Sequence, residues 1–149
     1  MPSVYLLKEK DDVQSLRQKH ECVLVCMNTI AENDSSLMVE DDSYSAKLQP
    51  LRIVLGKLSK LNPGWKILTD AFRRNTMIVV TDEDLRNNPD IVQHLESQGI
   101  SLLSTKSNAD GNIDLNSVLR TLGSLKFKSI LVEDTRELKN QFINMGLGN

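Results

Sequence analysis

Polar side chains gather directly behind one apolar segment near the amino terminus of the chain. Residues 22–27 carry no charge and have the length of a strand that is buried on both faces. Most of the residues that follow have hydrogen-bonding side chains, namely Asn28, Thr29, Glu32, Asn33, Asp34, Ser35 and Ser36. Open α/β sheets bind ligands beyond the carboxyl ends of their strands. We therefore expect a small-molecule site in residues 21–37.

Metal binding and nucleophilic catalysis have weaker support in the sequence. Glu40, Asp41 and Asp42 are adjacent, so their side chains point in different directions on a regular backbone, which favours a solvated loop over a metal site. Ser35 and Ser43 lie in no nucleophile-elbow motif and have no spaced histidine partner. We therefore predict no bound metal and no serine nucleophile.

The two cysteines are predicted to be small buried side chains. Cys22 and Cys26 lie four residues apart on one predicted strand, which separates them by about 13 Å and excludes a disulfide between them. A zinc site would need two further ligands, and His20 and His94 are not spaced to supply them. Both histidines are interpreted as surface residues.

Composition and charge limit the class of protein. A chain of 149 residues with 40% hydrophobic residues predicts a single domain over residues 1–149. The net charge is −2, and the basic clusters at 57–60 and 126–128 are short enough to be solvated faces, so nucleic-acid binding is not expected. Neither a membrane-spanning apolar run nor a signal-peptide core is present, which predicts an intracellular protein, cytoplasmic or nuclear.

Apolar segments of strand length alternate with amphipathic or polar segments along the chain. Strands are predicted over residues 22–27, 49–55, 76–81, 100–104 and 129–133. Helices are predicted over 10–19, 82–98 with an interruption at Pro89, 115–125 with Asp114 as N-cap, and 135–145. Residues 31–49 are interpreted as a surface loop, and residues 65–70 as a short strand or helical turn. This alternation indicates an α/β fold with a mainly parallel sheet.

Six segments, taken in order, resemble the pyrimidine reductase domain of riboflavin biosynthesis, of both the bacterial and the yeast type. They read LRQKHECVLVCMNTIAENDSSL, QPLRIVL, MIVVT, LESQGISLL, GNIDLNSVLRTLG and SILVEDTRELKNQFINMGLGN. The resemblance implies a dihydrofolate-reductase-like, three-layer α/β fold, here lacking the family's first and last strands. It also implies a homodimer and the use of NADPH to reduce the ribose of a phosphorylated aminopyrimidine to a ribityl chain.

Matches to the family's patterns imply a set of site residues. Arg17 matches an arginine that contacts substrate, and Leu37 and Glu133 match further substrate-contacting positions. Thr29 matches the threonine of the cofactor loop. The resemblance thus implies substrate binding by Arg17, Asn33, Leu37 and Glu133, and cofactor binding by Thr29, Asn33, Asp134 and Thr135.

The same comparison shows departures at positions that carry function. The V-G-x-G-T pattern has lost both glycines, which are Cys26 and Asn28 here, so backbone can no longer approach a cofactor as closely. The D-D-P pattern has become N-D-S at residues 33–35. Glu40 stands where the family has an arginine for the substrate phosphate, and a carboxylate there would repel that ligand.

The V-E-G-G pattern near the end has become Val132, Glu133, Asp134 and Thr135. A glycine pair between a strand and a helix lets backbone N–H groups cradle a pyrophosphate, whereas Asp134 places a Cβ and a negative charge there. An alternative role for Asp134 or Thr135 is the N-cap of the helix that follows.

Three hypotheses follow from these matches and departures. The first is a degenerate, non-catalytic member of the family that acts as a binding or assembly module. The second is an NADPH-dependent reductase with a divergent site, and the third is an unrelated α/β protein. For the first two we expect a homodimer or a protein partner, held through an exposed sheet edge and the C-terminal helix with Phe142, Ile143, Met145 and Leu147.

Overall fold

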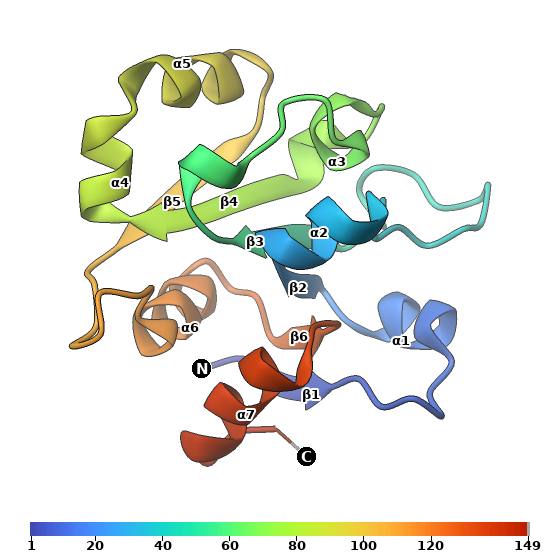
Figure 1. The fold of residues 1–149 in the computed structure, drawn as a ribbon. Coiled ribbons are helices and arrows are strands. Elements are labelled where there is room, and N and C mark those ends of the chain that lie inside the picture. Colours follow the sequence, from blue (N-terminus) through green and yellow to red (C-terminus); the bar gives the residue numbers. More distant parts are fainter. Residues whose placement is uncertain (149) are drawn as a thin grey trace.

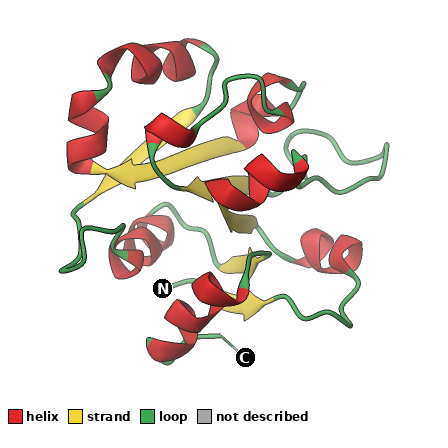
Figure 2. Ribbon diagram, in the orientation of Figure 1, coloured by secondary structure: helices red, strands yellow, loops and turns green. Residues whose placement is uncertain are grey.

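A six-stranded parallel sheet organises residues 1–148, which are the residues that the computed structural model describes (Figures 1 and 2). Its strands are β1 (Ser3–Leu6), β2 (Cys22–Cys26), β3 (Leu51–Leu55), β4 (Thr76–Thr81), β5 (Ser101–Thr105) and β6 (Ser129–Val132). They lie in the order β1-β6-β2-β3-β4-β5, and every neighbouring pair is parallel. The predicted α/β class with a mainly parallel sheet is confirmed.

Helices cover both faces of the sheet. They are α1 (Val13–Lys19), α2 (Met27–Asn33), α3 (Lys66–Thr69), α4 (Asp82–Asn87), α5 (Pro89–Ser97), α6 (Leu115–Ser124) and α7 (Arg136–Asn144), with short 3₁₀ turns η1 (Leu58–Lys60) and η2 (Arg73–Asn75). In Figure 1, α2 to α5 lie above the sheet, and α6 and α7 lie below it. Alternate residues of β2 feed the two resulting cores: Val23 and Val25 face one, and Cys22 and Leu24 face the other.

The order of the strands creates a topological switch point between β2 and β6. The chain runs from β2 through β3 and β4 to β5, and then returns over the opposite face through α6 to place β6 beside β2. Consequently α2 leaves the end of β2 toward one face, and α7 leaves the end of β6 toward the other (Figure 1). Crevices of this kind, at the carboxyl ends of parallel strands, are where open α/β sheets bind ligands.

Most predicted elements are present, two further elements were not predicted, and the interpretation of one loop was wrong. The strand β1 was not predicted, although it pairs with β6 from Ser3 opposite Ser129 onward. The polar residues behind β2 form the helix α2, which buries Met27 and Ile30, three positions apart. The loop that follows is not confined to the surface, because Leu37 and Val39 are each only 2% exposed.

Two predictions about helix ends are confirmed. The predicted helix over residues 82–98 is broken at Asn88, and Pro89 occupies the first turn of α5. Asp114 caps α6, because its carboxylate accepts a hydrogen bond from the backbone N–H of Asn116 (3.0 Å). In α7 the expected apolar surface is smaller than predicted, since Phe142 is fully buried and Ile143 alone is strongly exposed among the four residues named above.

Arg52, in the middle of the sheet, ties the loops behind α2 and α3 together. Its side chain is 1% exposed and pairs with Asp70 (Nη1 to Oδ2, 2.7 Å). It also donates to the backbone oxygens of Ser36, Ile67 and Phe72 at 2.8–3.1 Å. Breaking the pair with Asp70 would leave an unpaired charge in the core. Because Arg52 also binds the backbone oxygen of Ser36, it helps to fix the segment that carries Leu37.

Candidate functional site

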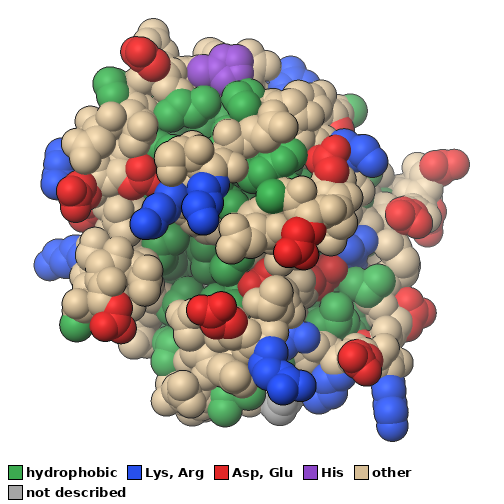
Figure 3. Space-filling model, viewed as in Figure 1, with side chains coloured by type: hydrophobic (Ala, Val, Ile, Leu, Met, Phe, Trp, Pro, Cys, Tyr) green, Lys and Arg blue, Asp and Glu red, His purple; other side chains and the backbone are tan. Residues whose placement is uncertain are grey.

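A cleft of about 540 Å³ lies at the carboxyl edge of the sheet, within the size range of small-molecule sites. It opens beyond the ends of β2, β3, β4 and β5 and is walled by the first residues of α4, α6 and α7. Figure 3 shows this hollow, with apolar side chains at its floor and two basic side chains on its rim. The predicted place of a ligand site, at the carboxyl end of β2, therefore coincides with one end of a real cleft.

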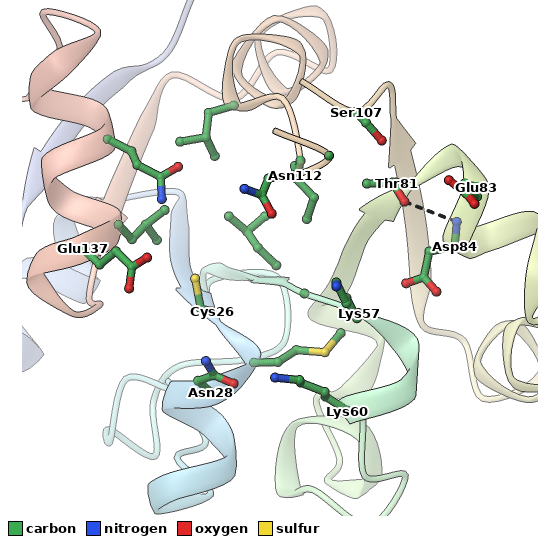
Figure 4. Close-up of a pocket in the computed structure, with 18 of the residues that line it drawn as sticks. Cys26, Asn28, Lys57, Lys60, Thr81, Glu83, Asp84, Ser107, Asn112 and Glu137 are labelled. Atoms are coloured by element: carbon green, nitrogen blue, oxygen red, sulfur yellow. Dashed lines mark hydrogen bonds between the residues drawn. The ribbon is translucent and has the colours of Figure 1, made fainter. Parts of the chain in front are cut away.

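Charged side chains of both signs face the cleft (Figure 4). Lys57 and Lys60 follow β3, and their ammonium groups point into the hollow. Glu83 opens α4 on one side, and Glu137 lies in the first turn of α7 on the other. These four side chains are exposed and form no ion pair within residues 1–148, so they remain available to a ligand.

Asp84 differs from the other carboxylates of the cleft because it accepts hydrogen bonds from other residues of the fold. Its Oδ2 accepts the backbone N–H of Leu58 (2.8 Å), and its Oδ1 accepts the side-chain amide of Asn88 (2.9 Å). The N–H of Asp84 is in turn capped by the hydroxyl of Thr81 (3.2 Å; dashed in Figure 4). Asp84 thus fixes the η1 turn, and with it Lys57 and Lys60, relative to α4.

The floor of the cleft is apolar and closely packed. Met27 lies across Gly56, where a Cβ would come within 2.6 Å of the Met27 Cγ, so the position after β3 requires glycine. Cys26 borders the same floor, and its sulfur faces the cleft (Figure 4). Burial first, and then the negative charge of Asp134, raise the pKa of the Cys26 thiol to about 12, which keeps it protonated and a poor nucleophile at neutral pH.

Two of the residues that the resemblance assigned to substrate, Arg17 and Glu133, contact each other and do not line the cleft. Arg17 of α1 forms a bidentate pair with Glu133, which follows β6, with both N···O distances at 2.8 Å. Arg17 also donates to the backbone oxygen of Met38 (2.9 Å). The two side chains are only 10% and 8% exposed, so this pair is part of the packed interior.

Two of the residues assigned to cofactor, Thr29 and Asp134, are joined across the switch point. Asp134, at the end of β6, accepts hydrogen bonds from the backbone N–H of Cys26 (3.1 Å) and from the hydroxyl of Thr29, both at the turn from β2 into α2. Asp134 is 9% exposed. Its carboxylate therefore bridges the ends of β2 and β6 and occupies two donors at the turn from β2 into α2.

The remaining predicted site residues have local roles in the structure. Asn33 is exposed, and its side-chain oxygen accepts the N–H of Ser35 (3.1 Å). Leu37 is buried with a left-handed backbone (φ 53°), a conformation that a branched residue adopts only when its surroundings hold it there. Thr135 is the N-cap residue of α7, as the alternative role predicts, although its side chain forms no cap hydrogen bond.

Sequence reasoning missed most of the residues that line the cleft. It applied the rule about carboxyl ends to residues 22–27 alone and interpreted Lys57 and Lys60 as a solvated face. Applied to every predicted strand, the same rule would have included Gly56 and Lys57 behind β3 and Thr81 at the end of β4. Asn112 gave no such signal, because the turn that carries it reaches the cleft only through tertiary packing.

Residues 5–149 match the protein family described as the RibD C-terminal domain. The chain belongs to this family. Its members include reductases of riboflavin biosynthesis, so the resemblance read from the six segments is confirmed. Among curated proteins, none matches the sequence.

Solved structures of the same family share the fold. RibD of Acinetobacter baumannii superposes with a TM-score of 0.75 at 20% identity over 100% of this chain. The riboflavin biosynthesis reductase Rib7 of Saccharomyces cerevisiae gives 0.73 at 19% identity over 99% of it, and a pyrimidine reductase-like protein of Corynebacterium diphtheriae gives 0.72 at 11% over 99%. The chain spans 44% of the Acinetobacter protein and 69% and 70% of the other two.

Residues 1–148 hold no group of three or more histidine, cysteine, aspartate or glutamate side chains placed to bind a metal ion. No helix within the same residues has the length and hydropathy needed to cross a bilayer.

Proposed function

We propose that this chain is a non-catalytic member of the riboflavin-biosynthesis reductase family that acts as a binding module. The observation that carries the proposal is the bridge from Asp134 to the Cys26 N–H and the Thr29 hydroxyl. It places a carboxylate that is only 9% exposed at the point where the resemblance expects an anionic cofactor. A second anion at that point would be repelled and would find its donors already taken.

The resemblance implies NADPH as the family's cofactor, and the residues at this crevice do not fit its pyrophosphate. Asp134 would have to turn away, which would leave the N–H of Cys26 without its partner and uncover a charge that is now 9% exposed. Glu137, in the first turn of α7, adds a negative charge on the side of the cleft that Cys26 borders. Binding of a dinucleotide in the family's manner therefore requires breaking contacts that hold the sheet and helices together.

The substrate side supports the same proposal. Arg17 and Glu133, which the resemblance assigns to the aminopyrimidine, satisfy each other through two hydrogen bonds of 2.8 Å. A ligand that used either side chain would have to separate a pair that is about nine-tenths buried, at a cost of several kcal/mol.

The alternative is an NADPH-dependent reductase that acts on a phosphoribosylaminopyrimidine. Lys57 and Lys60 favour it, because both ammonium groups face the cleft and are free to hold phosphate groups. In that case the cofactor would supply a hydride to the sugar, and the protein would bind and orient both molecules. Cys26 contributes no nucleophile in either case, since its thiol is protonated at neutral pH.

Calorimetric titration with NADPH decides between the two. The natural chain and the double variant Asp134→Gly/Thr135→Gly are titrated side by side, and NADPH oxidation is followed with the aminopyrimidine phosphate present. We expect no binding by the natural chain and binding tighter than about 100 μM by the variant, which corresponds to roughly 5.5 kcal/mol. Binding and turnover by the natural chain would overturn the proposal and establish the reductase.

A further inference from the structure

The charges that face the cleft at the carboxyl edge alternate in sign, and the order of the strands sets their sequence. In the sheet, β2 lies between β6 and β3, and β4 follows β3. Glu137 belongs to the helix that follows β6, and Lys57 and Lys60 come directly after β3. Glu83 belongs to the helix that follows β4. Across the cleft the order is therefore a carboxylate, two ammonium groups and a second carboxylate (Figure 4).

Two carboxylates make the end of the cleft beside Cys26 negative. After burial, which is the largest cause, the charges of Asp134 and Glu137 raise the pKa of the Cys26 thiol further, so both act at a sulfur that faces the cleft. The amino end of α7 offsets only part of this charge, since a helix dipole amounts to about half a positive charge. Arg136 is exposed but is not among the residues that line the cleft. This end of the cleft therefore attracts a cation.

The space on the two sides of the lysines is unequal. On the side of Glu83, the hydrogen bond from the N–H of Leu58 to Asp84 (2.8 Å) brings the η1 turn directly against α4, which leaves little room for a ligand. On the other side, the end of β2 separates Lys57 from Glu137. The ends of β3 and β6 are two strand spacings apart, which is about 10 Å. A ligand body therefore fits between the lysines and Glu137.

The surface between these charges is apolar. Met27, Leu55 and Leu138 line the cleft there and belong to the packed cores on the two faces of the sheet, so each is at most 4% exposed. The sulfur of Cys26 lies among them and is protonated at neutral pH. Thioether and thiol groups make favourable contacts with aromatic rings. The middle of an occupant is therefore expected to be an aromatic or apolar group.

From this arrangement we infer that the cleft binds a zwitterionic molecule, with a phosphate group at Lys57 and Lys60, an ammonium group at Glu137 and an aromatic body between them. The inference rests on the proposed function, because NADPH bound in the family's manner would bring a pyrophosphate, and not a cation, to this end of the cleft. It adds the chemical class of ligand that the binding module takes.

Two matched ligands test the ammonium site. Tyramine phosphate is the probe, because it carries an ammonium and a phosphate group at opposite ends of one aromatic ring. 4-Ethylphenyl phosphate has the same ring and phosphate group but no ammonium group. Both are titrated into the natural chain at about pH 7 and about 50 mM salt, where charge pairs are weakly screened. Binding is followed by NMR through the backbone amides of Lys57 and Glu137.

The natural chain should bind tyramine phosphate with a Kd below about 1 mM, and at least about threefold more tightly than 4-ethylphenyl phosphate. Glu137→Gln should bind the two ligands equally, because it keeps the shape of the side chain and removes the partner of the ammonium group. Glu83→Gln, in the same cleft, and Glu96→Gln, at an exposed position outside it, are controls that should keep the preference. Lys57→Ala with Lys60→Ala should weaken the binding of both ligands at least about threefold.

Three outcomes would overturn the inference. One is equal binding of the two ligands by the natural chain, or no binding of either below about 1 mM. The others are a preference that survives Glu137→Gln, and a preference that Glu83→Gln abolishes although its amide spectrum shows a folded chain. A parallel titration with NADPH separates these results from the proposed function. Without NADPH binding, each of them overturns this inference alone, whereas NADPH binding that shifts the Cys26 amide overturns both.

Discussion

The two regions at the carboxyl edge of the sheet differ in whether their polar groups have partners within the fold. At the switch point, Asp134 bonds to Cys26 and Thr29, and Arg17 bonds to Glu133, so each of these groups has a partner within the fold. In the cleft, Lys57, Lys60, Glu83 and Glu137 are exposed and face open space. The same sheet edge thus contains one polar cluster that holds the structure together and one that is free to bind.

Because of this difference, the residues that stabilise the fold are not the residues that are free to bind a ligand. A buried and fully paired group makes the native state depend on it, whereas an exposed group without a partner contributes little to the free energy of unfolding. Substitutions at the switch point should therefore lower stability, and substitutions in the cleft should leave it nearly unchanged.

The largest effect is expected from Glu133→Ala. This substitution leaves the Arg17 guanidinium buried without its carboxylate, and the free energy of unfolding should fall by about 3–5 kcal/mol in urea denaturation. The double variant Arg17→Met/Glu133→Met should recover most of this loss, because no unpaired charge remains. A loss below about 1 kcal/mol for Glu133→Ala would mean that the pair does not support the fold.

A smaller loss is expected from Asp134→Ala. The N–H of Cys26 and the hydroxyl of Thr29 lose their acceptor, which should lower the free energy of unfolding by about 1–3 kcal/mol. Asp134→Asn, which keeps a side-chain oxygen at the same place, should lose less. Equal destabilisation by both variants would argue that the charge, and not the hydrogen bonds, matters to the fold.

Cys26 lies between the two regions, and its thiol makes the stability of the fold depend on pH. Its folded pKa of about 12 lies above the value of 9.0 for a free thiol, so the native state holds the proton more tightly than the unfolded chain does. The stability that depends on this proton is complete below about pH 9 and is lost as the pH rises toward 12, at about 1.4 kcal/mol per pH unit. Unfolding of the natural chain and of Cys26→Ala between pH 8 and pH 10 measures it. A constant difference between the two curves would contradict the raised pKa.

The smallest effect is expected in the cleft. Lys57→Ala with Lys60→Ala should change the free energy of unfolding by less than about 0.5 kcal/mol, since both side chains are exposed and unpaired. Thermal denaturation measures this change, and Lys10→Ala with Lys106→Ala serves as a control at other exposed positions. Destabilisation comparable to that of Asp134→Ala would remove the distinction between the two regions.

Local sequence was enough to predict the sheet but not the partners of its polar groups. Uninterrupted apolar runs such as residues 76–81 identified β4 with its correct bounds, because a strand buried on both faces needs nothing else. The strand β1 is short and becomes a strand only through its pairing with β6, which lies more than one hundred residues away. The seven-residue helix α2 was hidden by polar residues, since only Met27 and Ile30 of its apolar face point inward.

The same limit applies to the candidate site. The resemblance named Arg17, Thr29, Glu133 and Asp134, but the sequence could not indicate that these residues bond to one another, because their contacts span 105 to 116 positions. Lys57 and Lys60 were interpreted from the sequence as solvated residues. This is correct for their exposure, but the sequence did not indicate that they line a cleft. Which groups are paired is a property of the tertiary structure.

The most direct test of the account is an NMR titration of the natural chain with NADPH that follows the backbone amide of Cys26. That N–H is bonded to Asp134, so its resonance should stay in place up to about 1 mM NADPH, whether or not amides in the cleft such as that of Lys57 shift. A shift of the Cys26 and Thr29 amides at lower concentrations would show that the cofactor displaces Asp134. In that case the switch point would be a cofactor site, and the central claim would be contradicted.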